Sequence, residues 1–170
     1  MRRKRRLFGV ACWPLLAMAL ATTGPALAQK PGGILRLYNI DSPASMSIHE
    51  EATVFSQMPM MAVFNNLVMF DQHVKQNSLQ VIVPDLAISW SWDEEGKQLT
   101  FKLREGVQWH DGKPFTAADV RCTWDMLLGK SNEKLRLNPR KSWYRNLDAV
   151  ITNGDYEATF ILKRPQPAFI

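Results

Sequence analysis

Cysteine and histidine are scarce in this sequence, and both scarcities exclude kinds of site. Its 170 residues include two cysteines, Cys12 and Cys122, and three histidines. No CxxC pair occurs, and His49, His73 and His110 lie far apart along the chain. A zinc site needs three or four closely placed nitrogen or sulfur ligands. We therefore expect no protein-bound metal and no cofactor.

A basic excess is also missing from most of the chain. The formal net charge is +5, from 21 Lys and Arg against 16 Asp and Glu. Five basic residues lie within the first six positions, namely Arg2, Arg3, Lys4, Arg5 and Arg6. From residue 29 onward the remaining 16 basic residues face 16 acidic ones. No basic run is left there to follow phosphate groups, so nucleic acid is not an expected partner.

The third absence is an apolar run of membrane-spanning length. Residues 7–20 are apolar, but Pro14 interrupts them and they fall short of the ~20 residues that span a bilayer. They follow the basic residues and precede Ala26-Leu27-Ala28, which is the order of a secretory signal. We predict a signal peptide over residues 1–28, cleaved after Ala28. The mature chain from Gln29 should have no stable membrane insertion.

The signal region also bears on the route and destination of export. Arg5 and Arg6, followed by Leu and Phe, partly match a twin-arginine signal, so ordinary secretion and twin-arginine export both stay open. Cys12 lacks the preceding leucine of a lipobox, and the apolar core continues past it. We expect a periplasmic protein that is not a lipoprotein. Cys122 would be its one thiol, without an intrachain disulfide.

The first forty mature residues predict one strand and one helix. Residues 34–38 favour a strand, and the polar loop NIDSPASMS follows. Residues 50–70 are apolar and rich in methionine, and Pro59 is expected to begin a helix rather than lie inside one. Methionines 58, 60 and 61 are thioether ligands of the kind found in soft-metal sites, but methionine at helical spacing is more typical of core packing.

Two hairpins are predicted from alternating apolar residues around short turns. In SWSWDEEGKQLTFKLREGVQW, Trp90 and Trp92 share one face, and a turn at residues 95–96 leads into the alternating Leu99, Phe101 and Leu103. In LDAVITNGDYEATFILKRP, Asn-Gly at residues 153–154 is a strong turn signal. Apolar residues alternate after it at positions 156, 158, 160 and 162.

One helix and a tight corner lie between these hairpins. Asp111 and Gly112 predict a turn that ends a strand carrying Val107 and Trp109. Thr116 and Asp119 form a capping pattern, with Phe115 and Val120 in the positions of a hydrophobic staple. Val120, Trp124, Leu127 and Leu128 place one apolar face on the helix. His110 and Asp111 could be an acid/base pair, but neighbours in a strand point to opposite faces, so structure is the favoured role.

The segment PDLAISWSWDEEGKQLTFKLREGVQWHDGKPFTAADVRCTWDML resembles the signature of solute-binding protein family 5. These proteins are the periplasmic peptide, oligopeptide and nickel-binding components of ABC importers. The resemblance extends through GGILRLYNIDSP and VFNNLVMFD upstream and NGDYEATFILKRPQPAFI downstream. The loop DSPASMSIHE departs from the family's D-P-x-S-L-D-P type of sequence, which leaves the class of ligand open.

The resemblance implies an α+β chain, the N-terminal part of a type II periplasmic-binding-protein-like fold. Residues 29–70 would begin ligand-binding lobe I, and residues 71–170 would form the family's additional α+β subdomain. Because family members are much longer, we expect a truncated product or a partial sequence in which the second lobe is missing. The additional subdomain would then fold alone, with residues 30–70 poorly ordered.

For function, the resemblance implies capture of a solute without chemistry. The lobes close on a small solute, commonly a peptide, which passes to an inner-membrane ABC permease driven by its ATPase subunit. The family's ligand contacts map to Glu51, Ala52, Thr53 and Val54, for which an ordinary helix-start role is the equal alternative. The other motif residues would be a structural hallmark: Trp109, His110, Asp111, Gly112, Thr116, Asp119 and Trp124.

Two other classes of protein fit parts of the sequence. A secreted carbohydrate-binding module could stack sugars on Trp90, Trp92, Trp109, Trp124 and Trp143, although several of these fall on core-facing positions. A secreted hydrolase could use His110 and Asp111, but no serine or cysteine nucleophile with an obvious partner accompanies them. Within the family, peptides, nickel complexes, opines and sugars all remain open as ligands.

Overall fold

The computed structural model describes residues 33–34, 36–60 and 63–170. The chain divides into two compact units, Met1–Tyr38 and Asn39–Ile170, and the predicted signal peptide lies outside the described residues. In the first unit, residues 33–34 and 36–38 form no helix or strand, so the predicted strand over residues 34–38 is wrong. An extended segment becomes a strand only when another backbone pairs with it, and no strand in the described ranges does so.

The second unit begins with a loop and a short helix. Helix α2 spans Val54–Met60 and contains Pro59, so the prediction that Pro59 begins a helix is wrong. Proline has no N–H and therefore leaves the carbonyl of Phe55, four residues earlier, without its helical donor. The side-chain amide of Asn39 donates a hydrogen bond to that carbonyl at 3.3 Å. This contact replaces the missing donor and lets the helix tolerate its proline.

A small antiparallel pair of strands follows. Strand β1 (Val68–Phe70) pairs with β2 (Ile82–Pro84), and the 3-10 helix η1 (Leu79–Val81) leads directly into β2. Leu67 and Val68 pack against the main hydrophobic core. The pair therefore connects the Met-rich segment to the larger sheet described next.

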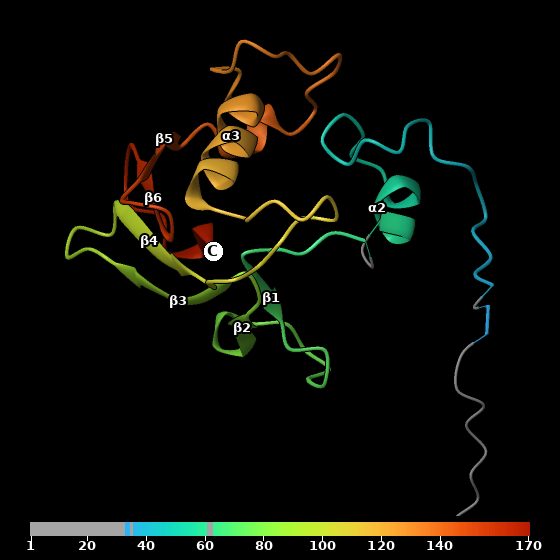
Figure 1. Ribbon diagram of the computed structural model, residues 1–170, viewed down its shortest axis with the longest axis horizontal. Coiled ribbons are helices and arrows are strands. Elements are labelled where there is room, and N and C mark those ends of the chain that lie inside the picture. Colours follow the sequence, from blue (N-terminus) through green and yellow to red (C-terminus); the bar gives the residue numbers. More distant parts are fainter. Residues whose placement is uncertain (1–32, 35, 61–62) are drawn as a thin grey trace, which may run out of the picture. The chain divides into compact units, whose positions relative to one another are not determined.

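The main sheet has four antiparallel strands in the order β3-β4-β6-β5 (Figure 1). Their bounds are Ala87–Trp92, Gln98–Leu103, Glu157–Leu162 and Leu147–Thr152 for β3, β4, β6 and β5 respectively. The two sequence-adjacent pairs, β3-β4 and β5-β6, confirm both predicted hairpins. An irregularity between Ala87 and Ser89 shifts the register, which lets Ala87, Trp90 and Trp92 all face the core.

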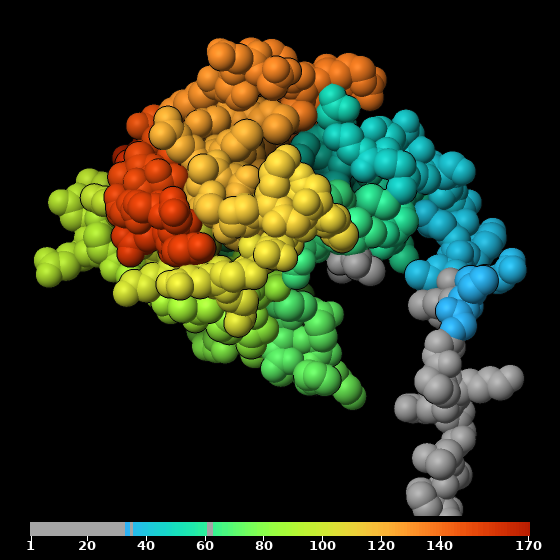
Figure 2. Space-filling model, viewed as in Figure 1, coloured from blue at the N-terminus to red at the C-terminus, as the bar shows by residue number. Residues whose placement is uncertain are grey.

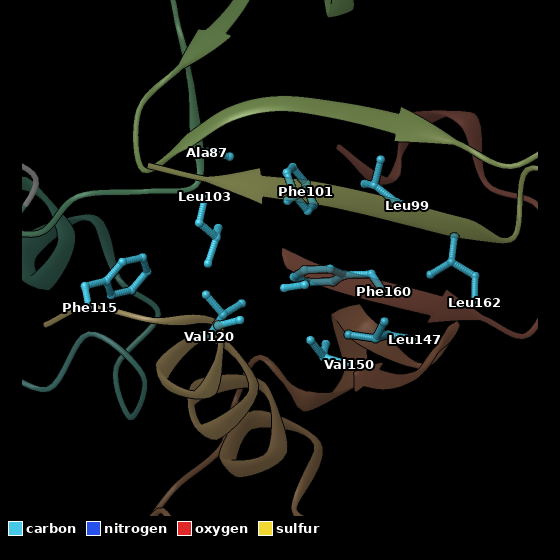
Figure 3. Close-up of a cluster of buried hydrophobic side chains, with 12 residues drawn as sticks. Ala87, Leu99, Phe101, Leu103, Phe115, Val120, Leu147, Val150, Phe160 and Leu162 are labelled. Carbon is cyan, nitrogen blue, oxygen red and sulfur yellow. The ribbon is translucent and has the colours of Figure 1, made fainter. Parts of the chain in front are cut away.

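One face of the sheet is covered by helix α3, which spans Ala117–Leu128. The capping box predicted from Thr116 and Asp119 is present, and the Asp119 carboxylate accepts the Thr116 N–H at 2.8 Å. The αL conformation of Gly129, with φ 73°, ends the helix. Helix and sheet enclose the core shown in Figure 3, where Phe160 meets Phe101 edge to face at 5.2 Å.

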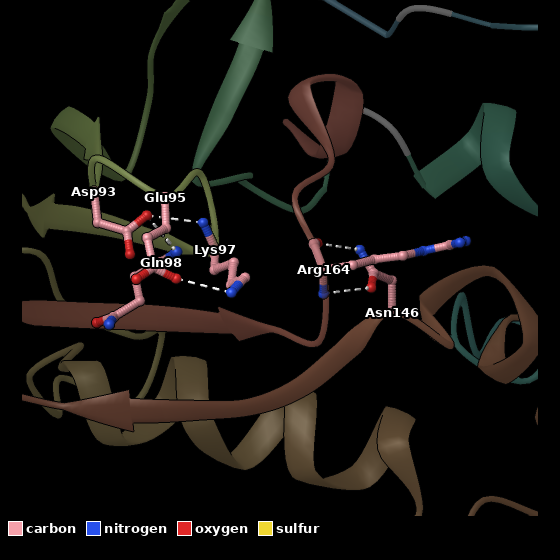
Figure 4. Close-up of polar contacts among 6 residues, drawn as sticks. All are labelled: Asp93, Glu95, Lys97, Gln98, Asn146 and Arg164. Carbon is pink, nitrogen blue, oxygen red and sulfur yellow. Dashed lines mark hydrogen bonds and ion pairs between the residues drawn. The ribbon is translucent and has the colours of Figure 1, made fainter.

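Polar side chains fix two of the connections around this sheet (Figure 4). In the β3-β4 turn the Asp93 carboxylate accepts the N–H groups of Lys97 and Gln98 at 2.8 and 3.0 Å. At the same end of the sheet, beside the start of β5 and the end of β6, the Asn146 amide donates to the Arg164 carbonyl at 2.9 Å, and its oxygen accepts the Arg164 N–H at 3.2 Å. Paired strands and a packed helix confirm the α+β class.

Candidate functional site

The four residues predicted to contact ligand lie at the start of helix α2. Glu51 Oε1 accepts the N–H groups of Ala52 and Thr53 at 3.0 and 3.3 Å, and the Thr53 carbonyl accepts N–H groups of the first helical turn. Glu51 and Ala52 are half-buried, whereas Thr53 and Val54 are exposed. The segment thus has the hydrogen bonds of a helix start and also presents two side chains to solvent.

A second loop, residues 130–140, contacts the first loop, residues 46–53, which leads into α2. The Arg136 N–H donates to Glu50 Oε1 at 2.6 Å, and Arg140 Nη2 donates to the Glu51 carbonyl at 3.2 Å. The Arg140 guanidinium also lies 5.7 Å from the centre of the Trp143 ring, a cation–π contact. In Figure 2 the orange surface of the second loop adjoins the cyan surface of the first. Glu51 and Arg140 therefore meet although 89 residues separate them.

These two loops hold every buried side-chain polar atom that lacks a hydrogen-bond partner in the described ranges. The atoms are His49 Nδ1, Asn138 Oδ1 and Arg140 Nε. Burial, and secondly the positive charge of Arg140, lower the pKa of His49. His49 is therefore expected to be neutral at pH 7, since its ordinary pKa is already about 6.5. Native proteins contain few unpaired buried polar groups, and each one requires an explanation.

His49 and Arg140 also line one cavity of about 610 Å³. Its polar wall includes Ser47, Asn65 and Asn66. Its apolar wall includes Trp124 of α3, Phe160 of the main sheet, and Phe115, which precedes α3. Ligand sites in proteins typically combine such a volume with an apolar lining and a few convergent polar groups. This cavity is thus the candidate site of the unit formed by residues 39–170.

The Trp-His-Asp-Gly corner lies at the edge of this cavity and is built as a tight turn. The Gly112 N–H donates to the Trp109 carbonyl at 2.9 Å. The Lys113 ammonium pairs with Asp111 at 2.9 Å, and this bond, followed by one from the Lys113 backbone, lowers the pKa of Asp111. The predicted strand before the corner is reduced to a single bridge between Gln108 and Pro114, because the chain reverses after too few residues to extend a ladder.

Within the corner, Trp109 and His110 have different surroundings. Trp109 packs edge to face on Phe115 at 5.9 Å and contributes to the cavity wall. The His110 side chain is exposed and makes no hydrogen bond to the residues that the structure describes. Asp111 is paired with Lys113 rather than with His110. The arrangement gives no acid/base relay between the two neighbours.

The tryptophans divide into packed and exposed groups. Trp90, Trp92 and Trp124 pack against the core, and Trp124 contacts both Tyr144 and Phe160 edge to face. Trp109 and Trp143 are 46% and 61% exposed. Three of the five proposed sugar-stacking rings are therefore engaged in packing, which weakens the carbohydrate-binding alternative.

Two features are absent from the described residues. No cluster of three or more His, Cys, Asp or Glu side chains there is arranged to hold a metal ion. None of the helices in those ranges combines the length and the apolar character that crossing a membrane requires. Cys122 is a free, exposed thiol on α3.

Comparison with protein families matches residues 81–170 to the family described as bacterial extracellular solute-binding proteins, family 5 Middle. The match covers more than half of the chain. This chain belongs to solute-binding protein family 5. The resemblance drawn from the Trp-rich corner, the capped helix and the two hairpins is thereby confirmed, since all four features lie within the matched residues.

Two relatives match shares of this chain that differ in size. A periplasmic alpha-galactoside-binding protein of Rhizobium meliloti is 51% identical over 43 residues, covering 25% of this chain and 6% of its own length. A dipeptide-binding protein of Escherichia coli is 32% identical over 102 residues, covering 52% of this chain and 19% of its own length. The chain thus spans about a fifth or less of these two relatives.

A solved structure in the family confirms the fold. The oligopeptide-binding protein AppA of Bacillus subtilis, in complex with a nonapeptide, has a TM-score of 0.59 and 28% sequence identity. The likeness covers 74% of this chain and 23% of AppA. The chain therefore has part of the family 5 binding-protein fold, as the sequence predicted.

The sequence did not point to Arg140 or His49. Arg140 lies in the polar stretch RLNPRKSWY, which has no periodicity, and His49 is a lone histidine in a loop. Their shared cavity and their unpaired nitrogens follow from a contact between distant segments. The one available signal was the Arg-x-x-Trp spacing of Arg140 and Trp143, which is too short to indicate a site by itself.

Proposed function

We propose that this chain is part of the extracytoplasmic solute-binding component of an ABC importer and serves in the capture of a peptide or similar small solute. The observation that carries the proposal is the family 5 match over residues 81–170. The cavity between the residue 46–49 loop and the main sheet supports it, because its volume and mixed lining suit a small organic molecule.

The nature of the solute is a finer part of the proposal. The relatives' names specify dipeptide and alpha-galactoside, and AppA was solved with a nonapeptide. Membership of the family is therefore compatible with more than one ligand class. Peptides are the first class to test because the dipeptide-binding relative matches a larger share of this chain than the galactoside-binding one.

The proposed residue roles follow the two loops that meet beside the cavity. Although none of them lines the cavity, Glu51, Ala52, Thr53 and Val54 are proposed to contact solute, with Thr53 and Val54 the exposed pair. In the proposed organisation, residues 29–70 begin lobe I and residues 71–170 form the additional subdomain. The second lobe of a complete binding protein would close over the solute from the other side.

The proposed cycle involves no bond making or breaking in this chain. Binding energy would come from burying the solute, and the solute would then pass to an inner-membrane permease whose ATPase subunit supplies the driving force. The capped helix and the corner hold the cavity wall in place. They are proposed to support the site rather than to react with the solute.

The proposed location is the periplasm, reached with removal of residues 1–28. Expression of the full chain in a Gram-negative host, followed by intact mass measurement of the periplasmic fraction, tests this proposal. A mass corresponding to a chain that starts at Gln29 is expected. A cytoplasmic chain of full mass, or a lipid-modified Cys12, would contradict it.

Solute capture is tested by thermal unfolding of the purified mature chain with separate additions of dipeptides, longer peptides and galactosides. A ligand that binds only the folded state stabilises it by about 2.7 kcal/mol at a concentration a hundredfold above its Kd. At least one peptide is expected to raise the melting temperature saturably. Absence of any shift across the set would count against solute capture by this chain.

A further inference from the structure

The charge of Arg140 is not neutralised within the described chain. None of the ion pairs in those residues involves Arg140. The nearby acids on the first loop are engaged with backbone groups, since Glu50 accepts the Arg136 N–H and Glu51 accepts those of Ala52 and Thr53. A half-buried guanidinium without a carboxylate partner therefore faces a largely apolar cavity.

The position of the guanidinium is nevertheless fixed from two sides. Nη2 donates to the Glu51 carbonyl at 3.2 Å, and the Trp143 ring lies 5.7 Å from the guanidinium carbon. Nε is buried and has no acceptor among the described residues. An unmade hydrogen bond at a buried charged group is costly. Such a preorganised and incompletely paired guanidinium is suited to a carboxylate, whose two oxygens match its fork of N–H donors.

His49 supplies a second polar group on the same cavity wall. Its Nδ1 is buried and unpaired within the described part of the chain. Burial and the nearby Arg140 charge favour the neutral imidazole by lowering the pKa of His49. A neutral imidazole can either donate or accept at Nδ1, according to its tautomer. It can therefore bond a carboxylate oxygen without adding a second full charge to the site.

We propose that Arg140 and His49 form a carboxylate-binding subsite, and that the rest of the cavity holds the apolar body of the same solute. Trp109, Phe115 and Trp124 line the apolar portion. The subsite thus selects small organic acids that carry an apolar or aromatic group. This inference rests on the proposed function, because it specifies the solute class of the same cavity.

The test uses a matched pair of probes, phenylacetate and phenylacetamide, which share the aromatic body and differ in charge. The mature full chain is titrated with each at constant ionic strength, and the Arg140 Nε–H and His49 signals are followed by NMR. Phenylacetate is expected to shift both signals saturably and to bind about tenfold or more tightly than the amide, because charge-assisted bidentate bonds exceed neutral ones.

Two variants separate recognition from a structural role. Arg140→Gln should remove the preference for the acid, whereas Arg140→Lys should retain only part of it because the ammonium lacks the planar fork. Arg136→Gln is the matched control, since it removes one positive charge from the same loop and keeps the backbone bond to Glu50. This control should leave the preference unchanged, and unaltered backbone spectra show that each variant is folded.

The outcomes distinguish this inference from the proposed function. Equal affinity for acid and amide, no saturable shift of the Arg140 signal with phenylacetate, or equal effects of the Arg136 and Arg140 variants would overturn the subsite. If the protein binds a peptide or galactoside but does not prefer the acid probe, the proposal of solute capture stands and the carboxylate subsite is refuted. If phenylacetate shifts the Arg140 NMR signal while no peptide or galactoside binds, the subsite stands and the peptide proposal is refuted.

Discussion

At the scale of single residues, His49 and Arg140 are coupled through charge. Arg140→Gln removes the positive charge that contributes to lowering the pKa of His49, so that pKa should rise. The rise should be partial, because burial is the larger cause and remains. An NMR titration of the His49 ring measures it, with Arg136→Gln as control. An unchanged pKa in the Arg140 variant, or the same rise in both variants, would show that the two residues are not coupled.

Two residues of the Trp-His-Asp-Gly corner, Gly112 and His110, are expected to differ in how well they tolerate substitution. Gly112 has a φ of 84°, where a side chain is strained, so Gly112→Ala should lower the free energy of unfolding by about 1 kcal/mol. The exposed His110 should tolerate replacement by Ala within about 0.5 kcal/mol. Urea unfolding followed by tryptophan fluorescence compares the two. A larger loss from His110→Ala would assign that side chain a role that its surroundings do not show.

Residues with local partners were predicted well, and residues with distant partners were not. Thr116 and Asp119 are three positions apart, so their capping box could be inferred from sequence and is present. Arg140 meets Glu51 across 89 positions. The pairing depends on how the whole unit folds, and no local pattern encodes it. The roles proposed for Glu51, Ala52, Thr53 and Val54 remain predictions.

At the scale of elements, the β3-β4 hairpin is expected to depend on pH through Asp93. The backbone N–H of Gln98, followed by those of Lys97 and Gly96, lowers the pKa of this carboxylate against an opposing effect of desolvation. A lowered pKa means that the unfolded chain takes up the proton first as pH falls. The contribution to stability is therefore complete above about pH 4, the ordinary range of aspartate, and is lost as pH falls through the lowered value.

Asp93→Asn tests this dependence, because the amide cannot take up the proton. The variant should be less stable than the parent at neutral pH and should lose less stability on acidification. Urea midpoints measured at about pH 7 and about pH 3 show the difference, since that interval includes the ordinary aspartate pKa. Glu94→Gln, a change in the same turn at an exposed side chain, is the control. Parallel pH curves for the parent and Asp93→Asn would refute the assigned role.

The elements also show where sequence patterns succeed. Alternation and the Asn-Gly turn predicted β3 to β6, because each hairpin buries its own apolar face. Pro59 was misplaced because the compensating Asn39 lies 16 positions before Phe55, outside any helical pattern. The strand over residues 34–38 was predicted from its position between the flexible KPGG and a turn-rich loop, without a partner strand.

At the scale of the whole molecule, packing among the residues that the structure describes is concentrated after residue 86. Every residue of the buried apolar cluster lies at or after Ala87, and helix α2 buries only Ser56. Amide hydrogen exchange should therefore be slowest in the central strands β4 and β6 and faster in residues 39–60, where fewer contacts must break. Equally slow exchange in residues 39–60 would contradict this distribution of stability.

Family membership and fold class could be predicted because a long ordered series of turns, caps and apolar positions supports them. The solute could not be predicted, because ligand recognition depends on a few side chains on a common fold. Here those side chains come from loops, where the sequence carries little periodic signal. The carboxylate subsite therefore had to be inferred from burial, charge and unpaired atoms.

Taken as a whole, this chain is proposed to capture a solute without altering it. Equilibrium dialysis of the mature protein against a mixture of peptides, galactosides and organic acids, followed by mass spectrometry of the retained compounds, tests it most directly. We expect saturable retention of at least one compound with its mass unchanged. Retention of none, or the appearance of a converted product that depends on the protein, would contradict it.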